Sequence, residues 1–220
     1  MHRLIRDRAW GARCVVRDGT VSPDERHDHA GTDGLPPITW SPTAPGIPLG
    51  VVSQQSVTRE EAFARIEAGG IEVRRVRLRE ILQVGRIQRR AFPPRLAYPI
   101  ATLLTLSFLP VVQFVVAVRD GRVLGCAIGD RSGLDARVIN IAVDPAARRL
   151  GVGAALLFEL ETKLSGGDMV LMVQRENIDA HALYLRVGYV DVGTAIDYYG
   201  RGRHGIWMRK HRPTKFPNRP

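Results

Sequence analysis

The sequence has little of what metal centres, disulfide frameworks and secretory signals require. Its 220 residues include only two cysteines, and Cys14 and Cys126 stand too far apart for a zinc or redox spacing. Residues 1–16 are basic but lack an apolar core long enough for a secretory signal. These absences predict a cytoplasmic protein in a reducing compartment, with no metal and no disulfide.

Lysine is also scarce, because only three of the 32 basic residues are lysines and the rest are arginines. A net charge of +10 favours a polyanionic partner, although a GC-rich coding sequence also produces such an arginine bias. The arginines between residues 74 and 90 lack the interleaved aromatic residues of a single-strand nucleic-acid platform. We therefore interpret them as a solvated strand edge and helix face. Association with the ribosome or another polyanion through this arginine-rich surface stays an alternative.

Charge is absent from residues 96–118, a run of 23 residues that could span a bilayer. Pro110 divides this run, four hydroxyl and amide residues interrupt it, and the turn signal Asp120-Gly121 follows. These features favour a buried helix followed by a buried strand, and no membrane association is expected.

Composition divides the chain into three segments. Residues 1–55 hold six prolines between Pro23 and Pro48 and show no sustained periodicity, which predicts a flexible, Pro/Gly-rich extension. The stretch Thr58-Arg59-Glu60-Glu61 is a capping-box pattern, so the folded domain is expected over residues 56–210. A basic tail, residues 211–220, follows.

Within the folded domain, the periodicity predicts a meander of strands followed by alternating strands and helices. That order is typical of a three-layer α/β (α+β) fold, with a mixed sheet and helices on both faces. The expected strands are 71–78, 113–119, 123–129, 137–143, 169–174, 189–195 and 205–209, and the expected helices are 58–67, 79–91, 98–107, 151–164 and 178–187.

The stretch Arg-Arg-Leu-Gly-Val-Gly, residues 148–153, lies where a strand ending at Asp144-Pro145 meets the helix 151–164. The first turn of a helix presents unpaired N–H groups and the positive end of its dipole, which together bind phosphate. Gly151 and Gly153 would let a diphosphate approach the main chain. A Walker motif is absent, and Leu156 stands where a dinucleotide motif needs a third glycine.

Two segments carry a family resemblance. Residues 148–153 match the Arg/Gln-x-x-Gly-x-Gly/Ala signature of the GNAT superfamily of N-acetyltransferases, and residues 175–193 are similar to its Asn-x-x-Ala-x-x-Leu-Tyr-x-x-x-Gly-Phe/Tyr motif. With Tyr198-Tyr199 and residues 206–208, the chain looks most like the branch that acetylates protein N-termini, including ribosomal proteins. The resemblance covers about residues 71–209 and implies a mostly antiparallel sheet whose fourth and fifth strands splay apart.

The resemblance also implies a co-substrate, acetyl-CoA, and roles for individual residues. Tyr184 would be the general acid that protonates the departing thiolate, a role that suits the pKa of a phenol. Asn177 would hydrogen-bond the pantetheine, the main chain at residues 141–143 would contact the acetyl and pantetheine groups, and residues 148–154 would cradle the pyrophosphate. The implied cofactor-binding residues are Ile141, Ala142, Val143, Arg148, Arg149, Leu150, Gly151, Val152, Gly153, Ala154 and Asn177.

The sequence departs from the pattern at the general base. Twelve residues before Tyr184, where related enzymes carry a Glu or His, stands Met172, whose thioether cannot accept a proton. Either another group deprotonates the amine, for which His181 on the same helix face is a candidate, or the amine arrives neutral. Residues 92–98, with Phe92 and Tyr98, lie where related enzymes shape the acceptor groove.

The sequence therefore predicts an acetyl-CoA-dependent N-acetyltransferase whose acceptor is a primary amine, the N-terminal α-amine of a protein or peptide being favoured. Three alternatives remain open: acetylation of a small-molecule amine, a non-catalytic acyl-CoA sensor, and a binder of RNA or the ribosome. Cys126, in a buried strand pattern, is expected to belong to the core.

Overall fold

The computed structural model describes residues 15–17, 20–22 and 56–212. The chain divides into two units, residues 1–49 and residues 50–220. In the first unit, β1 (Val15–Arg17) and β2 (Thr20–Ser22) pair antiparallel. A two-stranded hairpin of this length has only marginal stability of its own in water.

A seven-stranded sheet, in the order β3-β4-β5-β6-β7-β9-β8, organises the second unit. Neighbouring strands are antiparallel except β6 and β7, which are parallel. The expected mixed, mostly antiparallel sheet is therefore confirmed. Its strands are β3 (Glu72–Arg75), β4 (Gln113–Arg119), β5 (Arg122–Ser132), β6 (Asp135–Val143), β7 (Met169–Gln174), β8 (Val190–Ala195) and β9 (Gly205–Lys210).

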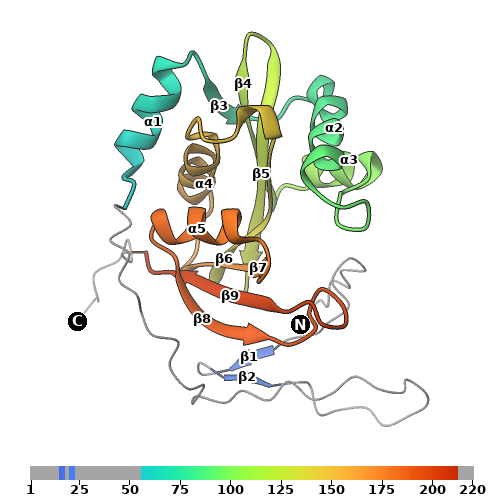
Figure 1. Cartoon of the computed structure of the whole chain (residues 1–220), viewed down its shortest axis with the longest axis vertical. Helices are drawn as coiled ribbons and strands as arrows, with labels where there is room; N and C mark the ends of the chain where they lie inside the picture. Colours follow the sequence, from blue (N-terminus) through green and yellow to red (C-terminus); the bar gives the residue numbers. More distant parts are fainter. Residues whose placement is uncertain (1–14, 18–19, 23–55, 213–220) are drawn as a thin grey trace. The chain divides into compact units, whose positions relative to one another are not determined.

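Helices cover both faces of this sheet, as expected (Figure 1). Side chains of α1, α4 and α5 enter one apolar core, and those of α2 and α3 enter a second core on the other face. The α-helices are α1 (Arg59–Ala68), α2 (Ile81–Ala91), α3 (Ile100–Phe108), α4 (Val152–Lys163) and α5 (Ile178–Arg186), and the 3₁₀ helices are η1 (Leu78–Glu80) and η2 (Pro145–Ala147).

Local sequence signals account for several element boundaries. The Thr58 hydroxyl accepts a hydrogen bond from the Glu61 N–H (3.2 Å), and the Glu61 carboxylate accepts one from the Thr58 N–H (2.9 Å), which completes the predicted capping box of α1. Asp120 and Gly121 both have positive φ (50° and 73°), so they form the tight turn between β4 and β5.

Arg212 holds the end of α4 in place. Its guanidinium donates hydrogen bonds to the carbonyl oxygens of Glu161, Leu164, Gly166 and Gly167 at 2.7–3.0 Å. Carbonyl groups at a helix C-terminus lack partners inside the helix, and an arginine is well suited to satisfy them. Arg212 lies two residues beyond the predicted domain boundary at 210, which stays a prediction.

The uncharged run 96–118 forms α3, a connecting loop and β4. The expected buried strand is confirmed, but the expected buried helix is wrong, since Leu103 is the one buried residue of α3. Leu104 and Phe108 are exposed because α3 contacts the domain along one stripe only. In the described part of the chain, no helix is long and apolar enough to cross a membrane.

Candidate active site

The sheet splays where β6 and β7 stop pairing, and we call this divergence between the two strands the cleft. The two strands pair only at Ala136 with Met169 and at Arg137 with Val170, although each continues for at least four residues more. A β-bulge at Ile139, the extra residue between the pairs that β6 makes with β5, marks the divergence. Main-chain groups of the following residues, including the predicted 141–143, therefore face the cleft without a partner strand in β7.

Asp144 fixes the turn that follows β6. Its buried carboxylate accepts hydrogen bonds from the Ala146 N–H (3.0 Å) and from the Arg90 guanidinium (2.8 Å). A second arginine, Arg122, lies 3.5 Å away. This carboxylate ties the end of β6 to α2 and to the β4–β5 hairpin, a contact that the sequence pattern did not reveal.

The predicted phosphate loop lies at the N-terminus of α4. Arg149 and Gly151 have positive φ (65° and 86°), a curvature that turns consecutive N–H groups toward one side. The Ala155 N–H bonds to the Gly151 carbonyl (3.1 Å), and among the described residues no backbone acceptor is found for the N–H groups of residues 152–154. These donors, with the exposed Arg148 and Arg149 beside them, fit the pyrophosphate of a coenzyme A molecule.

The two glycines of this loop also serve the packing of the protein. A Cβ at Gly153 would lie 2.9 Å from the Leu183 side chain of α5, and a Cβ at Gly151 would lie 3.0 Å from the Arg65 side chain of α1. Close packing between helices thus adds a second reason for both glycines beside the expected approach of a diphosphate.

Tyr184 projects from α5 into the interior below the cleft. Its side chain is 5% exposed, and burial raises its pKa well above the usual range of a tyrosine. Its ring centroid lies 5.8 Å from that of Tyr189. The hydroxyl therefore keeps its proton throughout the physiological pH range, as a general acid must.

A second tyrosine, Tyr199, approaches the same place from the β8–β9 loop. Its hydroxyl donates a hydrogen bond to the Met172 carbonyl (3.2 Å). Burial, and then the neighbouring tyrosines Tyr198, Tyr184 and Tyr98, raise the pKa of Tyr199. Tyr98 and Tyr184, which belong to two other segments, thus lie near enough to Tyr199 to influence its pKa. The sequence analysis gave Tyr199 no catalytic or binding role, because only the fold brings these segments near one another.

Met172 lies on the opposite face of β7 from Leu171 and Val173, which belong to the core around α4. Its side chain covers Gly205 of β9, where a Cβ would lie 2.5 Å from the Met172 sulfur. A thioether in this position packs against the neighbouring strand and offers no proton acceptor.

His181 and Asn177 both have partners within the domain. The His181 Nε2 lies 2.8 Å from Asp191 Oδ1 on β8, so the ring is hydrogen-bonded to a neighbouring carboxylate. The Asn177 Oδ1 accepts a hydrogen bond from the Ala180 N–H (3.3 Å) and so caps α5. Their predicted roles, as base and as pantetheine ligand, stay predictions.

Cys126 is fully buried, as expected for a core residue, and burial raises its pKa to about 12. It accepts a weak hydrogen bond from Gln88, whose amide also bonds to Asn140 (2.7 Å). A thiol held neutral in this way is not a nucleophile. The described residues contain no cluster of side chains suited to a metal ion.

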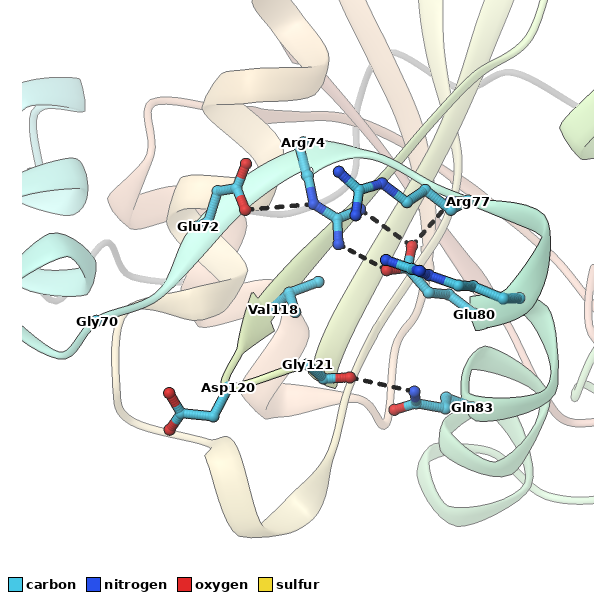
Figure 2. Close-up of a pocket in the computed structure, with 10 residues that line it drawn as sticks. Gly70, Glu72, Arg74, Arg77, Glu80, Gln83, Val118, Asp120 and Gly121 are labelled. Carbon is cyan, nitrogen blue, oxygen red and sulfur yellow. Dashed lines mark hydrogen bonds and ion pairs between the residues drawn. The ribbon is translucent and has the colours of Figure 1, made fainter.

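A surface pocket of about 480 Å³ lies beside β3 and the β4–β5 hairpin (Figure 2). One of its lining residues, Glu80, accepts two hydrogen bonds from Arg74 (2.6 and 3.1 Å) and one from the Arg77 N–H. Burial opposes ionisation, but these bonds outweigh it and lower the pKa of Glu80. Arg74, expected to be solvated, is thus half-buried in an ion pair, and none of the predicted site residues lines this pocket.

The sequence is similar to those of known acetyltransferases. A sequence profile described as an acetyltransferase (GNAT) domain matches residues 110–191. An uncharacterized N-acetyltransferase of Methanocaldococcus jannaschii is 32% identical over 145 residues, which cover 64% of this chain and 92% of that protein. The N-alpha-acetyltransferase RimI of Mycobacterium tuberculosis is 36% identical over 94 residues, 41% of this chain and 60% of that protein.

Solved structures share the fold. The ribosomal-protein-S18-alanine N-acetyltransferase from Escherichia coli is similar with a TM-score of 0.55 and 24% identity, covering 67% of this chain and 99% of that one. The structure of yncA from Salmonella typhimurium with its cofactor acetyl-CoA has a TM-score of 0.57 at 17% identity, covering 67% of this chain and 98% of that one.

Proposed function

The chain belongs to the GNAT family, as an N-acetyltransferase with acetyl-CoA as co-substrate, and from this premise we propose that its acceptor is the N-terminal α-amine of a protein or peptide. RimI, 36% identical over its matched part, is by its name an N-alpha-acetyltransferase. The E. coli structure with the same fold is by its title a ribosomal-protein-S18-alanine N-acetyltransferase.

The observation that carries this proposal is Met172. It lies on β7, twelve residues before Tyr184, the position at which the resembling enzymes carry a Glu or His that takes the proton of the incoming ammonium. Without such a base, the amine must arrive neutral. An α-amine, with a pKa of about 7.7 to 8.0, is neutral to a useful extent near pH 7.5, whereas only about a thousandth of a lysine side chain is.

The binding roles follow the elements described above. The N–H groups at the start of α4 and the side chains of Arg148 and Arg149 hold the pyrophosphate of the co-substrate. Main-chain N–H groups of β6 beyond the bulge, near Val143, polarise the carbonyl of the acyl group. Asn177, at the N-terminus of α5, contacts the pantetheine.

The co-substrate supplies an activated acetyl thioester. The neutral amine forms the new carbon–nitrogen bond as the carbon–sulfur bond breaks, and the surplus proton on nitrogen passes to water. Tyr184 donates the proton of its hydroxyl to the departing thiolate and regains one from solvent, so that atoms and charges balance. Most of the acceleration then comes from positioning the two substrates in the cleft.

Mass spectrometry of peptides incubated with the protein and acetyl-CoA tests the proposal. The panel holds peptides that differ in the first residue, each with one internal lysine, together with α-blocked copies and a set of small amines. We expect acetyl groups on the α-nitrogen of the free peptides and none on the blocked copies. Acetylation of the lysine, or turnover confined to the small amines, would contradict the proposal, and coenzyme A binding without any turnover would indicate a sensor.

A further inference from the structure

The segment between Glu80 and Arg119 carries charge of a single sign. It contains no acidic residue, and its charged residues are Arg86, Arg89, Arg90 and Arg95. All four arginines are exposed. Only Arg90 is engaged, in its ion pair with Asp144, and the other three have no ion pair with any described residue.

This segment, which includes α2 and α3, lies beside the end of β6. Arg90 reaches Asp144 directly after β6 (2.8 Å), and Tyr98 packs against the apolar cluster that contains Ala142 of β6. The β8–β9 loop lies on the same face of the sheet, since Tyr198 and Met172 both lie beside Gly205, on the face of β7 turned away from the α4 core. An acceptor that enters between the diverging ends of β6 and β7 on this face therefore passes beside the segment.

The β8–β9 loop opposite is also basic. Its acidic residue, Asp197, is occupied within the loop, since Oδ1 accepts a hydrogen bond from the Gly202 N–H (2.7 Å) and lies 3.6 Å from His204. Arg203 bonds to Gln174 (3.0 Å), and Arg201 is exposed. Both walls of the approach thus present more positive than negative charge to an acceptor.

We propose that the enzyme selects N-termini that are followed by acidic residues. The first residues of such an acceptor lie between the three tyrosines, and carboxylates beyond them lie against Arg89 and Arg95. Opposite charges across an approach of this kind mainly raise the association rate and penalise like-charged competitors. The inference rests on the proposed α-amine acceptor.

Peptides with identical first three residues and variable charge at positions four to eight test it. One series carries Asp and Glu at these positions, a second carries Ser and Gln, and a third carries Arg, so that no lysine competes. At low ionic strength we expect kcat/KM to be about 10-fold or more higher for the acidic than for the basic series. Because exposed charges are screened, this ratio should shrink toward one in 0.5 M salt.

Charge reversal tests whether Arg89 and Arg95 cause the preference for acidic peptides. The double variant Arg89→Glu/Arg95→Glu should lower the ratio of acidic to basic peptide turnover below one. The matched control is Arg131→Glu on β5: Arg131 is exposed and lies opposite Ala136 at the start of β6, whereas the cleft opens toward the end of that strand. The control should leave the ratio as in the wild type.

The outcomes distinguish failure of this inference from failure of the proposed α-amine acceptor, on which it rests. Failure to acetylate the α-amine of any peptide would overturn the α-amine acceptor. Equal turnover of the three series at low salt, with no effect of the double reversal, would overturn the acidic-acceptor inference and leave the acceptor assignment intact. Equal turnover together with salt-sensitive RNA binding through Arg89 and Arg95 would instead assign this wall to a nucleic acid.

Discussion

At the scale of single residues, burial keeps Tyr184 in the protonated form that its proposed role as general acid requires. Burial raises its pKa, so its hydroxyl stays protonated throughout the physiological pH range. Tyr184→Phe removes the proton but keeps the ring against Tyr189.

We expect Tyr184→Phe to lower kcat by about 100-fold, the usual scale for a positioned acid, with little change in affinity for acetyl-CoA. Thiol release and peptide acetylation should fall together, and calorimetry with coenzyme A checks the affinity. Wild-type turnover in this variant would return Tyr184 to a packing role.

The pH dependence of kcat/KM tests the absence of a base at Met172. The rate should rise with pH until the pKa of the acceptor α-amine, near 8, and then stay level. Because the raised pKa of Tyr184 keeps the acid form present, we expect no alkaline fall up to about pH 10. A plateau already reached by pH 6.5 would reveal another base.

The same pH profile, measured on two variants, tests whether a side chain acts as the general base. His181→Ala should leave it unchanged, since the ring is held by Asp191, and loss of a limb between pH 6 and 7 would identify His181 as the base. Met172→Glu should raise activity below pH 7.5, provided that the new carboxylate reaches the cleft.

Candidate site residues could be proposed from the sequence where a motif is contiguous, and less so where partners are distant. The phosphate loop and Tyr184 became candidates because their motifs lie within single segments. Asp144 and Arg90 are 54 residues apart, and Tyr199 and Met172 are 27 apart. Contacts of that separation leave no periodicity in a sequence, so the Asp144 clamp and the tyrosine cluster emerged only from the fold.

At the scale of elements, the junction of η2 and α4 combines two requirements at Gly151. Its φ of 86° strains any side chain, and its N–H lies at the start of the helix where an anion would bind. A carboxylate at this position would repel a pyrophosphate.

We therefore expect Gly151→Asp to abolish measurable coenzyme A binding while the domain stays folded. Gly133→Asp is the matched control, since Gly133 also has positive φ (64°) and a Cβ there would meet nothing within 4 Å. Both variants carry the backbone strain, so only loss of affinity specific to Gly151→Asp supports the loop assignment. Unchanged affinity in calorimetry would remove it.

Periodicity predicted the positions of the helices and strands more accurately than it predicted their lengths. The strand predicted at 169–174 is β7 without change, and the helix predicted at 178–187 is α5 to within one residue. The strand predicted at 71–78 ends at Arg75, because the Glu80 carboxylate binds Arg74 and the Arg77 N–H and so closes a turn into η1. A buried carboxylate, even one whose partners lie only three and six residues away, leaves no signal in a pattern of apolar residues.

At the scale of the whole domain, the parallel pair of the sheet determines where the site lies. A parallel connection needs a crossover, and α4 provides it between β6 and β7. The crossover places the N-terminus of α4 directly after the end of β6, so the anion-binding N–H groups and the open edge of β6 are neighbours. The topology alone therefore brings the two halves of the proposed coenzyme A site together, and the alternation of strands and helices in the sequence predicted this topology.

The boundary of the catalytic unit is open to a direct test by truncation. Residues 1–50 include six prolines between Pro23 and Pro48 and few apolar residues in any periodic order, so their composition predicts little buried surface. The Val57 N–H bonds to the Arg186 carbonyl (2.9 Å), a contact that a truncation after residue 50 preserves.

We expect the shortened chain to keep its melting temperature within about 2 °C, since a contribution of about 1 kcal/mol would shift it by roughly 2 to 8 °C. Peptide turnover should also be unchanged. Calorimetric scans of both chains, with and without coenzyme A, provide the measurement. A larger fall in both scans would mean that the extension stabilises the domain, and a fall only with coenzyme A would mean that it contributes to the bound state.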